Sequence, residues 1–191
     1  MSKKIKNLEL ILNMLFAVLA ITGVLIFFAI QFKINSPSSA INSKDLHKQM
    51  AQGSDQEFIE QMIPHHQEAI DTSKIIINRS ENTELKAFAN NIIKVQTAEI
   101  EMMDLWSNEW FGQSTKKVPY QAMMSDLLSL EGENLDNTYI EGMIKHHQGA
   151  IQMAEKIQTS TTRLELKNLA KEIVKTQSEE IQLLQNWLNR N

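Results

Sequence analysis

The chain has 191 residues, of which 42% are hydrophobic and 22% charged, and its formal net charge is −4 at pH 7. The apolar fraction excludes a disordered chain, and the negative charge excludes the basic footprint typical of nucleic-acid-binding proteins. The chain contains no cysteine, which excludes disulfides and cysteine-based zinc or redox sites. It also has no nucleophile–base constellation and no glycine-rich phosphate loop, so we expect no catalytic activity.

The N-terminal segment predicts a membrane anchor. Residues 10–32 are almost all apolar and long enough, at about 1.5 Å per residue, to cross a bilayer core of about 30 Å. Lysines within residues 1–9 predict a cytoplasmic N-terminus and a single-pass anchor in the cell membrane. A cleaved signal peptide is the alternative, but its apolar core is usually only about 7–15 residues long. Either alternative places the remaining chain outside the cytoplasm, in the periplasm or on the cell surface.

The rest of the chain divides into a linker and one helical domain that contains an internal repeat. Residues 33–44 are rich in serine with one proline and predict the linker, and residues 45–191 form the domain. Residues 55–110 align with residues 136–191 without a gap, at an offset of 81, and 22 of 56 positions are identical. This similarity indicates a duplication, with residues 111–135 as the connection between the two copies.

Each copy predicts two helices, because apolar residues recur at helical spacing on both sides of a short polar stretch. The first helix should begin at Ser54 or Asp55, and its copy at Asp136. The second helix should run to about Trp106, and its copy to Trp187. We therefore expect an all-α four-helix bundle made of two αα-hairpins. Two shorter helices are expected at residues 44–51 and 120–130.

The first helix of each copy carries the motif Met-Ile-x-His-His-Gln, at residues 62–67 and 143–148. On a helical wheel His66 falls inside the apolar stripe and His65 at its edge, with Met62 one turn earlier. The second helix places Gln96 and Glu99 in its own apolar stripe. Buried histidine and glutamate need partners. The pattern therefore predicts either a metal site or a hydrogen-bond network that only fixes the helix register.

Thioether and imidazole groups are ligands that favour copper, and thioethers favour Cu(I) in particular. Met62 and Met143 lie one turn from a histidine pair, Met103 lies beside Glu99, and Met153 lies two turns after His146. One histidine of each pair is expected to bind metal while the other contacts a glutamate. The candidate metal ligands are His65, His66, His146, His147, Met62, Met143, Met103, Met153, Glu99 and Glu180.

The two copies are not equivalent, because Met103 and Met153 correspond to Leu184 and Thr72. We therefore expect two related but different sites, or one composite site. A di-iron centre would need two Glu-x-x-His pairs, and the chain has none.

These motifs resemble a bacterial family of unknown function with a ferritin-like four-helix fold. Residues 55–70 match its pattern Asp-x-x-Phe-Ile-x-x-Met-Ile-Pro-His-His-Gln-x-Ala-Ile, and residues 136–151 match it with Tyr139 for Phe and Lys145 for Pro. Residues 96–106 match its later pattern Gln-x-x-Glu-Ile-x-x-Met-x-x-Trp, from which the second copy lacks the methionine. The resemblance covers residues 45–191. It implies an exported protein associated with copper binding and copper tolerance through histidine and methionine, and it implies no known catalytic activity.

The sequence thus predicts a membrane-anchored, extracytoplasmic protein that binds or buffers copper, as Cu(I) or Cu(II). The alternative is a non-catalytic structural or interaction bundle whose His-Glu-Gln network is purely structural. The expected partners are a metal ion and the membrane, and no nucleic acid. A homo-oligomer is compatible with the sequence.

Overall fold

The structure is a computed structural model that describes residues 55–112 and 119–190. These residues belong to one unit of the chain, Lys44–Asn191. The described part contains helices and irregular segments but no strand. Its helices are α3 (Asp55–Arg79), α4 (Thr83–Phe111), α5 (Gly132–Ser160) and α6 (Leu164–Leu188). The expected all-α four-helix bundle is confirmed for this part of the chain.

Several predictions fall on residues outside the described ranges. They include the N-terminal residues 1–9, the membrane anchor at 10–32, the linker at 33–44 and the short helix at 44–51. Among the residues that the structure does describe, none of the helices combines the length and the apolar character needed to cross a membrane.

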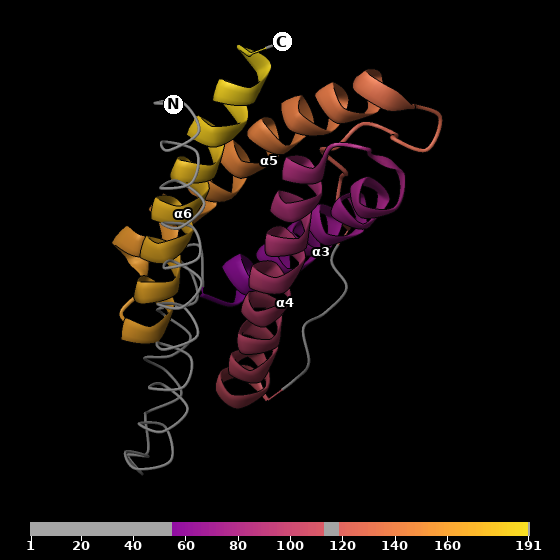
Figure 1. The fold of residues 1–191 in the computed structure, drawn as a ribbon. Coiled ribbons are helices and arrows are strands. Elements are labelled where there is room, and N and C mark those ends of the chain that lie inside the picture. Colours follow the sequence, from indigo (N-terminus) through magenta and orange to yellow (C-terminus); the bar gives the residue numbers. More distant parts are fainter. Residues whose placement is uncertain (1–54, 113–118, 191) are drawn as a thin grey trace. The chain divides into compact units, whose positions relative to one another are not determined.

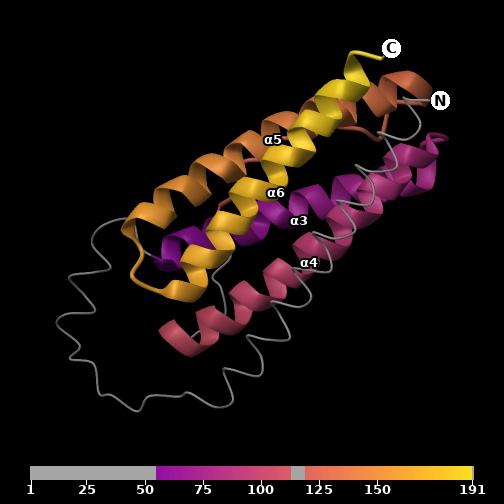
Figure 2. The ribbon, with the colours of Figure 1, turned by 60° about the vertical axis from the view of Figure 1, so that its left-hand side comes forward.

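The four helices form two hairpins, α3 with α4 and α5 with α6, and the hairpins meet mainly along α3 and α5 (Figure 1). In the turned view the four helices run roughly along one direction (Figure 2). The loop between α3 and α4 is short because Asn82 caps α4, its side chain accepting a 3.1 Å hydrogen bond from the Leu85 backbone N–H. This arrangement places the two histidine motifs, one on α3 and one on α5, face to face.

Two of the predicted helix bounds are wrong. Helix α5 begins at Gly132, four residues before the predicted Asp136, and the extra turn buries Leu135 completely. Helix α4 continues past Trp106 because Trp110, one turn later, stacks on it with ring centroids 5.0 Å apart. Gly112 then ends α4 in the left-handed conformation, with φ of 67°, which glycine adopts without strain.

The predicted short helix at residues 120–130 is also wrong, because this segment is irregular. Its backbone groups find partners on α3 in place of helical ones. The Met123 and Met124 N–H groups donate to the Glu68 carboxylate, and Arg79 Nη1 donates to the carbonyl oxygens of Leu127 and Leu128 at 3.1 and 2.7 Å. These tertiary hydrogen bonds, together with burial of the Leu127 side chain, outweigh the local helical preference.

The apolar core lies between the two hairpins and draws on all four helices. One cluster of packed residues joins Phe58 and Met62 of α3 to Trp106 of α4, Ala154 of α5 and Ile173 of α6. Burial of this apolar surface stabilises the bundle by about 25 cal/mol per Å². The core therefore fixes the spacing of α3 and α5, which is the spacing that sets the geometry of the histidines.

Candidate metal centre

The four motif histidines lie buried where α3 contacts α5. Each is at most 2% exposed. The rings of His65 and His146 stack across the contact, with centroids 3.6 Å apart and planes 34° apart. His65 and His146 are equivalent positions of the two copies, 81 residues apart. The structure thus brings the two motifs together at one place instead of keeping them apart.

The second histidine of each motif pairs with a glutamate from the neighbouring helix of its own hairpin. His66 Nε2 donates a 2.8 Å hydrogen bond to Glu99 Oε2, and both side chains are buried. His147 Nε2 lies 2.9 Å from Glu180 Oε2, close enough for an ion pair but without the alignment of a hydrogen bond. The sequence predicted a glutamate contact for one histidine of each motif, and these are the two histidines that make it.

His146 uses its Nε2 atom within the protein. Nε2 lies 2.9 Å from the backbone carbonyl oxygen of His65 and 3.4 Å from Glu68 Oε2. A carbonyl oxygen only accepts, so Nε2 carries the proton and donates. Burial lowers the pKa of His146, against the opposing effect of Glu68, so the ring is held neutral. A protonated Nε2 has no lone pair to offer a metal ion.

His65 differs from His146, because neither of its ring nitrogens has a hydrogen-bond partner within the part of the chain that the structure describes. Its side chain is nevertheless buried, with only 2% of its surface exposed. Burial, followed by the charges of the three other motif histidines, lowers the pKa of His65 to about 2. The ring is therefore neutral at physiological pH, and one of its buried nitrogens carries an unused lone pair. A buried polar atom without a partner is costly unless a ligand or an ion supplies one.

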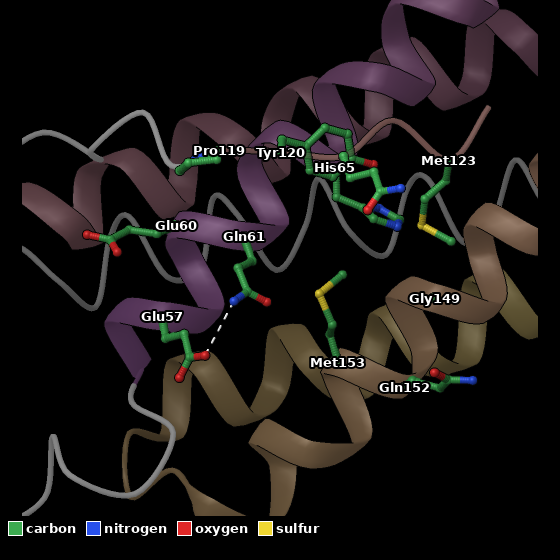
Figure 3. A pocket seen from close by; sticks show the side chains of 11 residues that line it. Glu57, Glu60, Gln61, His65, Pro119, Tyr120, Met123, Gly149, Gln152 and Met153 are labelled. Carbon is green, nitrogen blue, oxygen red and sulfur yellow. Dashed lines mark hydrogen bonds between the residues drawn. The ribbon is translucent and has the colours of Figure 1, made fainter. Parts of the chain in front are cut away.

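Beside His65 is a cavity of about 460 Å³, open between α3, α5 and the connection. Two methionines line it, Met153 from α5 and Met123 from the connection. Figure 3 shows the side chains of His65, Met123 and Met153 directed into the same space. Met123 is 44% exposed, so the cavity is reachable from solvent.

Gly149 on α5 leaves room for His65 and Met123 to approach each other. A Cβ atom at this position would lie 3.3 Å from His65 Nε2, 3.3 Å from Met123 Sδ and 3.1 Å from Met123 Cε. The imidazole nitrogen and the thioether sulfur therefore flank one point in space. With Met153 on the same cavity wall, the chain presents one nitrogen and two sulfur donors within a small volume.

Glu68 occupies the corresponding position on α3, since residues 68 and 149 are 81 apart. Its carboxylate accepts hydrogen bonds from the backbone N–H groups of Met123 and Met124 and from the Tyr120 hydroxyl. Burial raises the pKa of Glu68, but hydrogen bonds from His146, Tyr120 and Met124 outweigh burial and lower the pKa to about 2. Glu68 is therefore an ionised carboxylate that partners His146, whereas Gly149 leaves His65 without a partner.

The other predicted ligands lie away from this cavity wall. Met62, Met103 and Met143 are fully buried, and Met62 and Met103 pack within the apolar core. Gln96 is buried as predicted, and so is its copy Gln177, but among the described residues their side-chain carbonyl oxygens have no partner. Of the ten predicted metal ligands, only His65 and Met153 line the cavity.

The sequence analysis missed Met123, Glu68 and Gly149. Met123 lies in the connection, outside the repeated segments, so the comparison of copies gave no information about it. The difference between Glu68 and Gly149 was visible, because it interrupts the matching run His-His-Gln-x-Ala-Ile in both copies. A charged residue replaced by glycine inside such a run signals that the two copies differ at the site.

Within residues 55–112 and 119–190, no group of three or more histidine, aspartate or glutamate side chains is arranged to hold a metal ion. The cavity is lined by one imidazole and two thioethers, and also by the carboxylates of Glu57 and Glu60. The imidazole and the thioethers are soft donors, which suit Cu(I) better than they suit the hard cations that prefer carboxylates.

Comparison with known proteins identifies relatives of this chain. Among curated proteins, none matches it. Among solved structures, CopM in the Cu(I)-bound form is 39% identical, with a TM-score of 0.66 over 72% of this chain and 96% of CopM. CopM in the Cu(II)-bound form is 37% identical, with a TM-score of 0.67 over 71% and 96% of the two chains.

A DUF305 fragment from Deinococcus radiodurans is 27% identical, with a TM-score of 0.64 over 71% of this chain and 95% of the fragment. The family model described as Domain of unknown function (DUF305) matches residues 55–188, which contain all four helices and both histidine motifs. This chain therefore belongs to the DUF305 family.

Proposed function

We propose that this protein binds copper, and that it holds Cu(I) in the cavity between His65, Met123 and Met153. The observation that carries the proposal is a buried imidazole without any hydrogen-bond partner, placed beside two thioethers. His66 and His146 each have a hydrogen-bond partner, and His147, which has none, lies 2.9 Å from the Glu180 carboxylate. Among the described residues His65 has neither a hydrogen bond nor an ion pair, and it faces the cavity.

The chemistry of the donors favours Cu(I) over harder ions. Neutral imidazole and thioether are good ligands for a soft monovalent ion, and neither has to lose a proton at neutral pH. Glu57 and Glu60 line the same cavity, and Figure 3 shows them away from His65 and Met123. Their carboxylates add negative potential, which attracts a cation without supplying the ligands.

The comparisons support copper as the ion. CopM, at 37–39% identity, has been solved with Cu(I), with Cu(II) and with silver bound. Silver is a soft monovalent ion like Cu(I). The imidazole and thioether donors of the present chain suit soft ions of this kind.

The remaining motif residues have a structural role in this proposal. The His66–Glu99 and His147–Glu180 pairs fix the register of each hairpin and hold α3 and α5 at the spacing that exposes His65 to the cavity. We further propose that the protein has no catalytic activity and acts as a copper-binding or buffering protein. In this proposal residues 10–32 anchor it in the cell membrane and residues 45–191 lie outside the cytoplasm.

Thermal unfolding of the full chain with Cu(I) under anaerobic conditions tests the copper site. Copper that binds only the folded chain stabilises it by about 2.7 kcal/mol when free copper is about a hundred times Kd. The melting temperature should rise for the wild type but not for a Met123→Leu, Met153→Leu double variant. Leucine has nearly the volume of methionine and lacks the sulfur.

Met124→Leu is the matched control, because Met124 neighbours Met123 in sequence but packs on Gly142 instead of beside His65. This variant should keep the full copper-dependent rise. A wild-type melting temperature that copper does not change would contradict the proposal and favour a purely structural bundle.

A further inference from the structure

Glu68 makes an unusual set of contacts for a glutamate on a helix surface. It accepts 2.9 Å hydrogen bonds from the backbone N–H groups of both Met123 and Met124, and a further bond from the Tyr120 hydroxyl. All three donors belong to one five-residue stretch of the connection, residues 120–124, which lies 52 to 56 positions after Glu68 in the chain. The Glu68 side chain is only 11% exposed, and its bonds to Tyr120 and Met124 are partly buried.

The backbone that Glu68 holds carries two methionines that lie on glycines of α5. Met124 Sδ is 3.0 Å from the position of a Cβ on Gly142, and Met123 Sδ is 3.3 Å from that of a Cβ on Gly149. The two glycines are seven residues apart, so they lie on one face of α5 two turns from each other. The connection thus crosses from Glu68 on α3 to a glycine face on α5.

The same segment covers His65 from a second direction. The Tyr120 ring meets the His65 ring edge-on, with centroids 6.2 Å apart and planes 81° apart. Tyr120 and Met123, on either side of His65, are therefore both fastened by one carboxylate. Residues 120–123 themselves have no helix or strand to hold them in place.

From these contacts we propose that Glu68 is a positioning residue that fastens residues 120–124 across α3 and α5, so that the Met123 thioether faces His65. This rests on the proposed copper site, because Met123 is one of its ligands. A thioether on an unsupported segment would be ordered only at the moment of binding, and that ordering would weaken affinity. Residues that orient a ligand without touching the metal typically change metal affinity by about 10–100-fold.

The test uses the full chain labelled with ¹³C at the methionine methyl groups, with Ag(I) as the probe. In the wild type, the methyl signals of Met123 and Met153 should shift on addition of Ag(I). In Glu68→Ala, affinity for Ag(I) should fall roughly tenfold. The Met153 methyl should still shift, while the Met123 methyl should shift much less. Tyr120→Phe, which removes only one of the hydrogen bonds, should give a smaller loss in the same direction.

Asp71→Ala is the matched control. Asp71 lies one turn further along α3, is 60% exposed and pairs with Gln67 and Lys74 on its own helix. Its removal takes away the same charge but leaves residues 120–124 fastened, so affinity and both methyl shifts should be unchanged. An equal loss of affinity in Asp71→Ala would overturn positioning in favour of a general charge effect.

Amide hydrogen exchange in the metal-free chain separates failure of this inference from failure of the copper site. Glu68→Ala should speed exchange at the Met123 and Met124 amides, which donate to the lost carboxylate. Unchanged exchange, or an undiminished Met123 methyl shift, would overturn the role of Glu68 while leaving the copper site in place. A wild type in which neither methyl responds to Ag(I) would overturn the copper site and this role together.

Discussion

The two sides of the stacked histidine pair carry the same motif, yet only His65 has an unpartnered Nε2 atom, and that atom lies at the cavity. On one side, His146 donates to the His65 carbonyl and contacts Glu68. On the other side, the residue equivalent to Glu68 is Gly149, and both nitrogens of His65 lack partners. One difference between equivalent positions therefore separates a histidine whose Nε2 atom is engaged within the protein from one whose Nε2 atom is available at the cavity.

This difference also changes what surrounds each histidine. The carboxylate of Glu68 holds the connection, and the connection then reaches over to the Gly149 side and delivers Met123 there. The side with the carboxylate thus supplies the support, and the side with the glycine supplies the space. If the two copies were identical, both positions would be glutamate or both would be glycine. The carboxylate that holds the connection and the space beside His65 would then not occur together.

Substitution of the stacked histidines, one at a time, should have the largest effect on Ag(I) affinity and should show whether the two sides differ. We expect His65→Gln to weaken Ag(I) binding by more than about a hundredfold, because it removes a ligand, and even residues that only orient ligands are worth about 10–100-fold. His146→Gln should change affinity little, since an amide can still donate to the His65 carbonyl. Competition titrations with a chelator measure both. Equal losses would mean that both histidines bind metal.

Loss of either buried glutamate should instead affect the two sides equally. Glu99→Leu leaves the His66 Nε2–H without an acceptor, and Glu180→Leu removes the carboxylate that lies 2.9 Å from His147 Nε2. Each buried donor left unpaired should cost about 1–3 kcal/mol of unfolding free energy. Urea unfolding of the two variants measures this cost. A clear loss in only one variant would show that the two pairs do not have the same structural role.

A methyl group added at Gly149 tests whether the space beside His65 is used, and Gly142 on the same helix provides the control. Gly149→Ala puts a carbon near both His65 Nε2 and Met123 Sδ, so we expect about tenfold weaker Ag(I) binding, or about 1.4 kcal/mol. Gly142→Ala, two turns away, meets only Met124 and should leave binding unchanged. Both variants gain the same helix propensity of roughly 1 kcal/mol. Similar affinities for the two variants would show that the space at Gly149 is not used.

The smallest expected effect concerns a second difference between the copies. Tyr139 and Ser73 share a buried 2.7 Å hydrogen bond, whereas the equivalent residues, Phe58 and Ala154, are apolar. Tyr139→Phe alone should cost about 1 kcal/mol of unfolding free energy, because Ser73 loses its partner. Adding Ser73→Ala should restore most of that loss. A double-mutant cycle from thermal unfolding checks this coupling, and strictly additive losses would contradict it.

Much of the bundle follows from sequence periodicity, and much of the cavity does not. A helical wheel placed His66, Gln96 and Glu99 among apolar residues, and all three are buried. The spacing of positions along one helix is enough for this, because the helix geometry is regular. The contact between His65 and His146 depends on how α3 crosses α5, which periodicity does not describe.

The connection was the least predictable part. Its apolar spacing predicted a helix at residues 120–130, but the Met123 amide instead bonds to a carboxylate 55 residues earlier. No local pattern reports such a partner. The candidate ligand Met123 was missed for the same reason, whereas Met153, which lies on a regular helix, was found.

The most direct test of the account is a crystal structure of the full chain soaked in Ag(I), with the anomalous signal of silver used to locate the ion. We expect a strong peak within bonding distance of His65 Nε2 and Met123 Sδ, and none at His146 Nε2. A strong peak at the His146 side, or peaks at His66 and Glu99 in place of His65, would contradict the claim that Gly149 and Glu68 make only one side of the histidine stack available to a metal ion.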